Sequence, residues 1–143
     1  MLKRKLLVGM LILGLALFVG ACGDDDDDYA PDSAAGRTYR MAVTAATGAY
    51  AALAPGTFTT VFQTDGTYVN TPETDNVPAD QGSYIYTKIG DDSGEVTLTS
   101  TAVPGVVYTC VFSFTSEGAG AYAVTAVGGG SQIGGFSGTF QEI

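Results

Sequence analysis

The sequence predicts an all-β domain over residues 36–143, built as a single antiparallel up-and-down barrel of about eight strands. From residue 36 onward threonine, valine, tyrosine and phenylalanine dominate, and these residue types favour strands. Apolar and polar residues alternate with a period of two in successive short segments, which glycine or Asp-Gly turn signals separate. No segment has a convincing helical period, and about 108 residues are enough for one domain with one core.

The positions of the strands follow from this alternation. One apolar face recurs on nearly every segment, as at Phe58 and Phe62 in the second and at Val96 and Leu98 in the fifth. A dry face opposite a wet face is typical of an antiparallel sheet curled around a core. The eight expected strands are 37–46, 57–63, 66–71, 81–88, 94–101, 105–115, 119–127 and 133–142.

Short turns between these segments favour a meander. Asp65-Gly66, between two alternating segments, is a strong hairpin signal, and residues 90–94 and Glu117-Gly118 are further turn signals. Closing eight strands into a barrel removes the exposed edges that would otherwise aggregate. An immunoglobulin-like sandwich is the main alternative, but it needs a longer crossover than the regular hairpin spacing provides.

The longer connections are few. Residues 41–54 are rich in alanine and admit one or two helical turns around Ala49 to Leu53, because Gly48 and Pro55 limit the segment. Residues 71–80 contain two prolines and are predicted to form an exposed loop, and the three glycines at 128–130 predict another.

The first 21 residues have the layout of an export signal. Basic residues at 3–5 precede an apolar run from Leu6 to Val19. The run ends in Val19-Gly20-Ala21-Cys22, which resembles the lipobox of bacterial lipoproteins. By this resemblance residues 1–21 are a cleaved signal peptide, and the sulfur of Cys22 carries the lipid that anchors the protein to a membrane. An uncleaved transmembrane helix is the alternative, since the run is near the lower limit of about 17 residues for a span.

Residues 22–35 are expected to be the lipidated cysteine followed by an acidic, disordered linker. Five aspartates, residues 24–28, form a block of like charge, which is typical of solvated tails. The block also resembles the surface-export tag of some bacterial lipoproteins, and it lacks the spaced ligands of a calcium loop. Gly23 stands where an aspartate would resemble an inner-membrane retention signal. We therefore expect the cell envelope, in the outer membrane, at its periplasmic face or at the cell surface.

The charge of the mature chain excludes one class of partner. After cleavage three basic residues, Arg37, Arg40 and Lys88, remain against all fifteen acidic ones, which gives a formal net charge of −12. Such a chain is not expected to bind nucleic acid through phosphate contacts, and it is a poor partner for an anionic membrane surface.

The residue inventory also disfavours catalysis. The chain has no histidine, which removes the commonest metal ligand and general base and excludes Ser-His-Asp and Cys-His mechanisms. Asp91, Asp92 and Glu95 surround one turn and are expected to be a solvated hairpin tip rather than a calcium site. Cys110 lies in an apolar stripe and is expected to be buried. We therefore expect no enzyme, no metal and no cofactor.

Several aromatic-and-glycine patterns resemble those of small lipocalin-like, calycin-type barrels. The resemblance covers most of residues 36–143 and implies an up-and-down barrel able to hold a ligand. It also implies that a basic residue, here Arg37 or Arg40, packs as a closure at the barrel end. The chain departs from true lipocalins in having no tryptophan, and its strands are short for a roomy cavity. The matching segments are 36–39, 62–68, 82–86, 96–99 and 135–140.

Four tyrosines are the candidate ligand-pocket residues, because a tyrosine hydroxyl inside a barrel needs a polar partner or a ligand. These are Tyr84, Tyr86, Tyr108 and Tyr122. The leading hypothesis is a membrane-anchored envelope lipoprotein whose barrel binds a small hydrophobic ligand or an envelope protein without catalysis. The alternative is a structural or interaction lipoprotein with a filled barrel, acting through loops 71–80 and 128–132. An open cavity distinguishes the first from the second.

Overall fold

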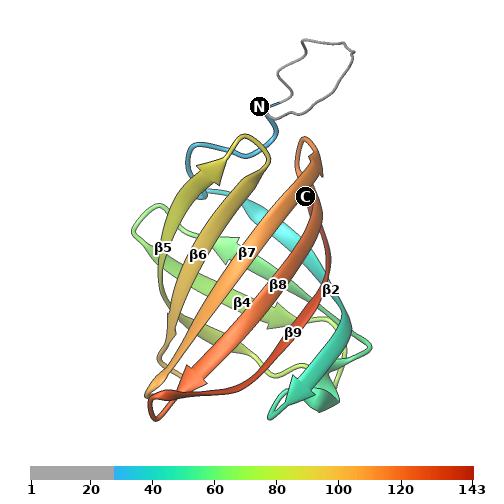
Figure 1. Cartoon of the computed structure of the whole chain (residues 1–143), viewed down its shortest axis with the longest axis vertical. Helices are drawn as coiled ribbons and strands as arrows, with labels where there is room; N and C mark the ends of the chain where they lie inside the picture. The colour runs from blue at the N-terminus through green and yellow to red at the C-terminus, as the bar shows by residue number, and fades with distance from the viewer. Residues whose placement is uncertain (1–27) are drawn as a thin grey trace, which may run out of the picture.

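A computed structural model describes residues 28–143 and shows a closed barrel of eight antiparallel strands in sequence order, with β9 returning to β2 (Figure 1). The predicted fold class is confirmed, and the sandwich alternative is wrong. No strand boundary differs from the expected one by more than two residues. The strands are β2 (Thr38–Gly48), β3 (Gly56–Phe62), β4 (Thr67–Pro72), β5 (Asp80–Gly90), β6 (Ser93–Ser100), β7 (Val106–Ser116), β8 (Ala119–Gly128) and β9 (Ser131–Glu142).

The connections are mostly tight turns. The expected helical stretch is a single 3-10 turn, η1 (Ala51–Leu53). The glycine stretch predicted as a loop is a two-residue turn between β8 and β9, and Gly129 and Gly130 both have positive φ, which that kind of hairpin turn requires. Within residues 28–143 no helix is long and apolar enough to cross a membrane. The predicted signal peptide, residues 1–21, and Cys22 lie outside the described residues.

The last strand closes against the first at a very short distance. Gly138 on β9 lies opposite Val43 on β2, and a Cβ atom at Gly138 would overlap the carbonyl oxygen of Ala42. Only glycine permits this approach of the two backbones. The register shifts between Val43 and Ala45, which is the kind of bulge that bends a strand around a barrel.

An aromatic cluster fills the interior at one end of the barrel. Its ring centroids lie 4.9 Å apart for Phe112 and Phe140, 5.0 Å for Phe114 and Phe140, and 5.6 Å for Tyr39 and Phe140. These pairs meet nearly edge to face, an arrangement that stabilises by about 0.5–1.5 kcal/mol a pair beyond the area buried. The end of the barrel that receives the N-terminal segment is therefore solidly packed.

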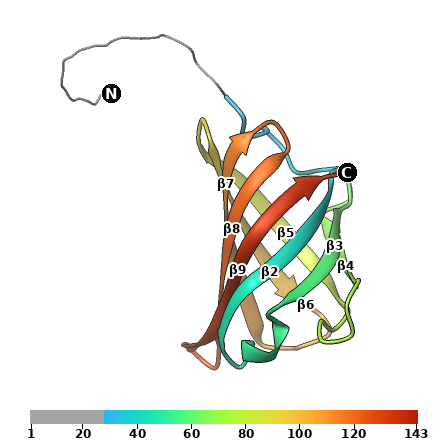
Figure 2. The same ribbon diagram turned by 90° about the vertical axis from the view of Figure 1, so that its right-hand side faces the viewer.

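Residues 28–35, expected as the end of the linker, lie against this same end (Figure 2). Ala30 and Ala34 are buried, since their small side chains fit over the barrel end. The Tyr86 hydroxyl donates to the Pro31 carbonyl at 2.7 Å, and Lys88 Nζ lies 2.6 Å from Asp28 Oδ1. We call this end, with its N-terminal cover, the closed end.

Candidate functional site

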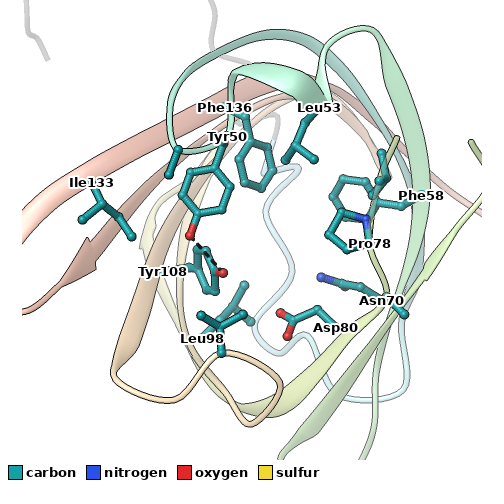
Figure 3. Close-up of a pocket in the computed structure, with 14 residues that line it drawn as sticks. Tyr50, Leu53, Phe58, Asn70, Pro78, Asp80, Leu98, Tyr108, Ile133 and Phe136 are labelled. Atoms are coloured by element: carbon teal, nitrogen blue, oxygen red, sulfur yellow. Dashed lines mark hydrogen bonds between the residues drawn. The ribbon is translucent and has the colours of Figure 1, made fainter. Parts of the chain in front are cut away.

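A cavity of about 340 Å³ lies at the other end of the barrel, which we call the open end. The open end carries the connections β2–β3, β4–β5, β6–β7 and β8–β9, whereas the chain enters at the closed end (Figure 2). Residues of η1 and of the β4–β5 loop join the inner faces of the strands in lining the cavity (Figure 3).

One asparagine ties the two connections that frame the cavity. The Asn76 side-chain amide donates to the carbonyls of Ala52, Leu53 and Pro55 at 3.0, 3.1 and 2.9 Å. Val77 beside it is buried. The prediction of a simply exposed loop over 71–80 is therefore wrong in part, because the middle of the loop packs against the β2–β3 connection and builds one wall.

The greater part of the cavity wall is apolar. Three aromatic rings meet there, from Tyr50 just before η1, Phe58 on β3 and Phe136 on β9. The ring centroids of Tyr50 and Phe136 are 5.9 Å apart, and those of Phe58 and Phe136 are 6.3 Å apart. Leu98 on β6 and Ile133 on β9 add aliphatic surface. Such a wall favours an apolar molecule over water.

Few polar groups line the cavity, and they point into it. The Asp80 carboxylate and the Asn70 amide lie on one side, and the hydroxyls of Tyr50 and Tyr108 lie on the opposite side (Figure 3). The Tyr50 hydroxyl donates to the Tyr108 hydroxyl at 3.1 Å. The Asn70 Oδ1 accepts from Thr60 at 2.7 Å, so its NH₂ group is the part that faces the cavity.

Asp80 is held in place by neighbouring donors. The Tyr68 hydroxyl donates to Asp80 Oδ2 at 2.7 Å, and the Ser100 hydroxyl donates to Oδ1 at 2.5 Å. The Val103 N–H in turn donates to the Ser100 hydroxyl at 3.0 Å. Three strands and the β6–β7 connection thus fix the carboxylate in one orientation.

Of the four predicted pocket tyrosines, Tyr108 lines the cavity. Burial, followed by its hydrogen bond with Tyr50, raises the pKa of Tyr108 above its usual range, so the hydroxyl stays protonated. The other three donate to backbone carbonyls: Tyr84 to Gln63 at 2.8 Å, Tyr86 to Pro31 at 2.7 Å and Tyr122 to Ala42 at 3.1 Å. The structure therefore does not bring the four together, and a ligand-binding role for Tyr108 stays a prediction.

Sequence reasoning missed Tyr50, Asn70 and Asp80. The last two carry a signal in the period-2 pattern. Side chains two or four positions apart on a strand point to the same face of the sheet. Asn70 is two residues after the inward-facing Tyr68, and Asp80 is four residues before Tyr84 on β5. The pattern therefore predicts that both face inward. Tyr50 carries no such signal, because it lies in a connection outside the strands.

The remaining candidate residues have structural surroundings. Within residues 28–143 no three histidine, cysteine, aspartate or glutamate side chains come together as a metal site, and Asp91 and Asp92 are exposed at a turn. Arg37 Nη1 lies 3.2 Å from Glu142 Oε2, which joins the start of β2 to the end of β9. Arg40 Nε lies 3.2 Å from Glu73 Oε1 on the outside of the barrel.

In comparisons with known proteins, no family model, no curated protein and no solved structure matches this chain.

Proposed function

We propose that this protein is a lipid-anchored envelope protein whose barrel binds a small, largely apolar molecule in the open-end cavity, without catalysing a reaction. The observation that carries this proposal is the cavity itself, about 340 Å³ with an apolar wall and a few convergent polar groups. Small-molecule sites typically have this size and character. The closed eight-stranded barrel supports the resemblance to lipocalin-like carriers, since such barrels hold at most one small ligand.

The predicted lipid anchor on Cys22 would leave the cavity accessible to a ligand. Cys22 precedes Asp28 by six residues, a length of chain that spans at most about 20 Å. A lipid on Cys22 would therefore hold the closed end toward the membrane and leave the open end facing away from it. In this arrangement, which we place at the outer membrane, the ligand enters from the aqueous side.

A binding role is favoured over a catalytic one by the groups at hand. The chain has no histidine to act as a general base. Cys110 is buried and does not line the cavity, and burial raises the pKa of its thiol, so it is not an available nucleophile.

Native mass spectrometry of residues 28–143 purified from an envelope source tests the proposal. This part of the chain contains the whole closed barrel and, among the described residues, a buried core that runs from Ala30 to Phe140, so we expect it to fold on its own. We expect an added mass that disappears on denaturation, or uptake of the neutral fluorescent probe N-phenyl-1-naphthylamine. A clean mass with no uptake of the probe would refute the binding role and favour the filled-barrel interaction protein.

A pair of substitutions ties binding to the cavity. Leu98→Trp adds a ring to the cavity wall and should weaken probe uptake by about tenfold or more. Ile85→Trp adds the same ring at a position that is 70% exposed on the outside of β5, and should leave uptake unchanged. Equal uptake by both variants would mean that the probe binds elsewhere.

The anchor is tested separately. Cys22→Ser should release the protein from the membrane fraction, because the serine hydroxyl cannot carry the thioether-linked lipid. Membrane binding as firm as before would contradict the lipid anchor without touching the cavity.

A further inference from the structure

We infer that the open-end cavity selects a small organic cation, a molecule with an apolar body and a protonated amine that lies against the Asp80 carboxylate. The inference rests on the proposed binding function and deepens it by naming the chemical class of the ligand. It follows from three features. The Asp80 carboxylate has unused acceptor positions, the basic side chains of residues 28–143 are paired with other acids, and aromatic rings line the same cavity.

The Asp80 carboxylate has acceptor capacity left over. Each of its oxygens accepts one hydrogen bond, from Tyr68 and from Ser100. A carboxylate offers about four lone-pair positions, so about two remain. Figure 3 shows its oxygens directed into the cavity beside Asn70, and Asp80 is among the lining residues.

No cation of the barrel offsets the charge of Asp80. Residues 28–143 contain three basic side chains, and each is ion-paired with other acids, at 3.2 Å, 3.2 Å and 2.6 Å in their shortest contacts. The half-buried Asp80 carboxylate accepts only from neutral hydroxyl donors, so it lacks a counter-charge that a bound organic cation would supply. The pairs are Arg37 with Glu142, Arg40 with Glu73, and Lys88 with Asp28 and Asp32.

The aromatic rings in the cavity wall suit a cation with an apolar body. Tyr50, Phe58, Tyr108 and Phe136 present aromatic rings to the same space. Aromatic faces attract organic cations and also pack against aliphatic or aromatic groups. The acidic chain as a whole favours the approach of a cation and disfavours an anion. The cavity volume of about 340 Å³ corresponds to about eleven water molecules, so the cavity can hold only a small molecule.

A purely structural role for Asp80 gives a different expectation. If the carboxylate served only to accept from Tyr68 and Ser100, its removal would change stability and would not change which ligands bind. Ligand preference therefore separates the two roles.

Isothermal titration calorimetry with three probes of similar shape tests the inference on residues 28–143. The probes are phenethylamine, 2-phenylethanol and 3-phenylpropanoate, which carry a cation, a neutral hydroxyl and an anion. We expect phenethylamine to bind about tenfold or more tightly than 2-phenylethanol, and 3-phenylpropanoate to bind most weakly. This ranking on the unaltered protein decides the inference even if a variant fails to fold.

Asp80→Asn is the matching variant, since it keeps the shape of the side chain and removes its charge. It should lower the affinity for phenethylamine by about tenfold while leaving that for 2-phenylethanol within about threefold. Asp75→Asn is the control, because it makes the same change in the β4–β5 loop at an exposed residue that does not line the cavity. It should change neither affinity.

The outcomes separate the inference from the proposed function. Equal affinity for the amine and the alcohol, or an unchanged preference in Asp80→Asn, would overturn the cation inference and leave the binding function standing. Binding of none of the three probes, together with no uptake of the neutral naphthylamine, would overturn both.

Discussion

The Tyr68 hydroxyl donates a 2.7 Å hydrogen bond to Asp80, and through it the packed interior of the barrel meets the cavity wall. Tyr68 has no exposed surface, while Asp80 lines the cavity. Burial, followed by the hydrogen bond to Asp80, raises the pKa of Tyr68 above its usual range. The phenol therefore stays a neutral donor, and the carboxylate keeps a partner that water does not replace.

Tyr68→Phe should lower the free energy of unfolding by about 2 kcal/mol, because hydrogen bonds to charged groups stabilise by about 1.5–3 kcal/mol and Asp80 loses one such donor. Urea denaturation of residues 28–143 measures the change. Tyr84→Phe is the control, since its hydroxyl donates at an exposed site to the neutral Gln63 carbonyl, and it should cost less than about 1 kcal/mol. Equal losses in the two variants would contradict a special role for the Tyr68–Asp80 contact.

Gly138→Ala should destabilise the barrel by about 3 kcal/mol or more, since the added methyl overlaps the Ala42 carbonyl and forces β9 away from β2. Gly128→Ala is the matched control at the end of β8, where the nearest side-chain atom, Val106 Cγ2, is 3.3 Å from the added carbon. Thermal unfolding followed by circular dichroism compares the two. A Gly138→Ala protein as stable as Gly128→Ala would mean that the closure of β2 against β9 tolerates a wider spacing.

The strands could be predicted because their signal is local. A period of two with turn residues at intervals places each strand within a few residues, as for β3 with Phe58 and Phe62 on its inner face. The Asp65-Gly66 turn then predicts that the chain reverses between β3 and β4 to form a hairpin. Closure itself depends on Gly138, whose need for a missing Cβ becomes visible only when β9 lies beside β2.

The position of the cavity and most of its lining residues could not be predicted, because the signal for them is non-local. It exists where Asn76 holds the β4–β5 loop to the β2–β3 connection, a contact between residues more than twenty positions apart. The same holds for the predicted tyrosines. Tyr122 is 80 positions from Ala42, whose carbonyl accepts its hydrogen bond, so the sequence could identify a hydroxyl in need of a partner but not the partner.

The stability of the barrel should fall as the pH rises above about 10. Removal from water is the main cause that raises the pKa of four buried tyrosines. The folded state therefore keeps hydroxyl protons that the unfolded chain loses from about pH 10. The stabilisation is complete below the unfolded pKa and is lost as the pH rises from there toward the folded pKa. The Cys110 thiol adds a loss of the same sign from about pH 8.5. The buried tyrosines concerned are Tyr39, Tyr68, Tyr108 and Tyr122.

Urea denaturation at a series of pH values from about 8 to 11 measures this loss, which each such tyrosine increases by up to about 1.4 kcal/mol per pH unit. Tyr68→Phe should make the free energy of unfolding fall less steeply with pH above pH 10, because the variant lacks one of the tyrosine protons that the folded state retains. A free energy of unfolding that stays flat to about pH 11 would show that the tyrosines reach water in the folded protein.

Cys110 should resist thiol reagents until the barrel unfolds. It is 3% exposed, and burial raises the pKa of its thiol, so both access and the reactive thiolate are lacking. We expect its reaction with a disulfide reagent to be at least about a hundredfold slower in buffer than in denaturing urea. Ser113→Cys, at an exposed position on the same strand, is the control and should react at once. Fast labelling of Cys110 in buffer would contradict the closed packing around β7. The same titration of the mature protein in urea counts the free thiols: one if the sulfur of Cys22 carries a lipid, and two if it does not.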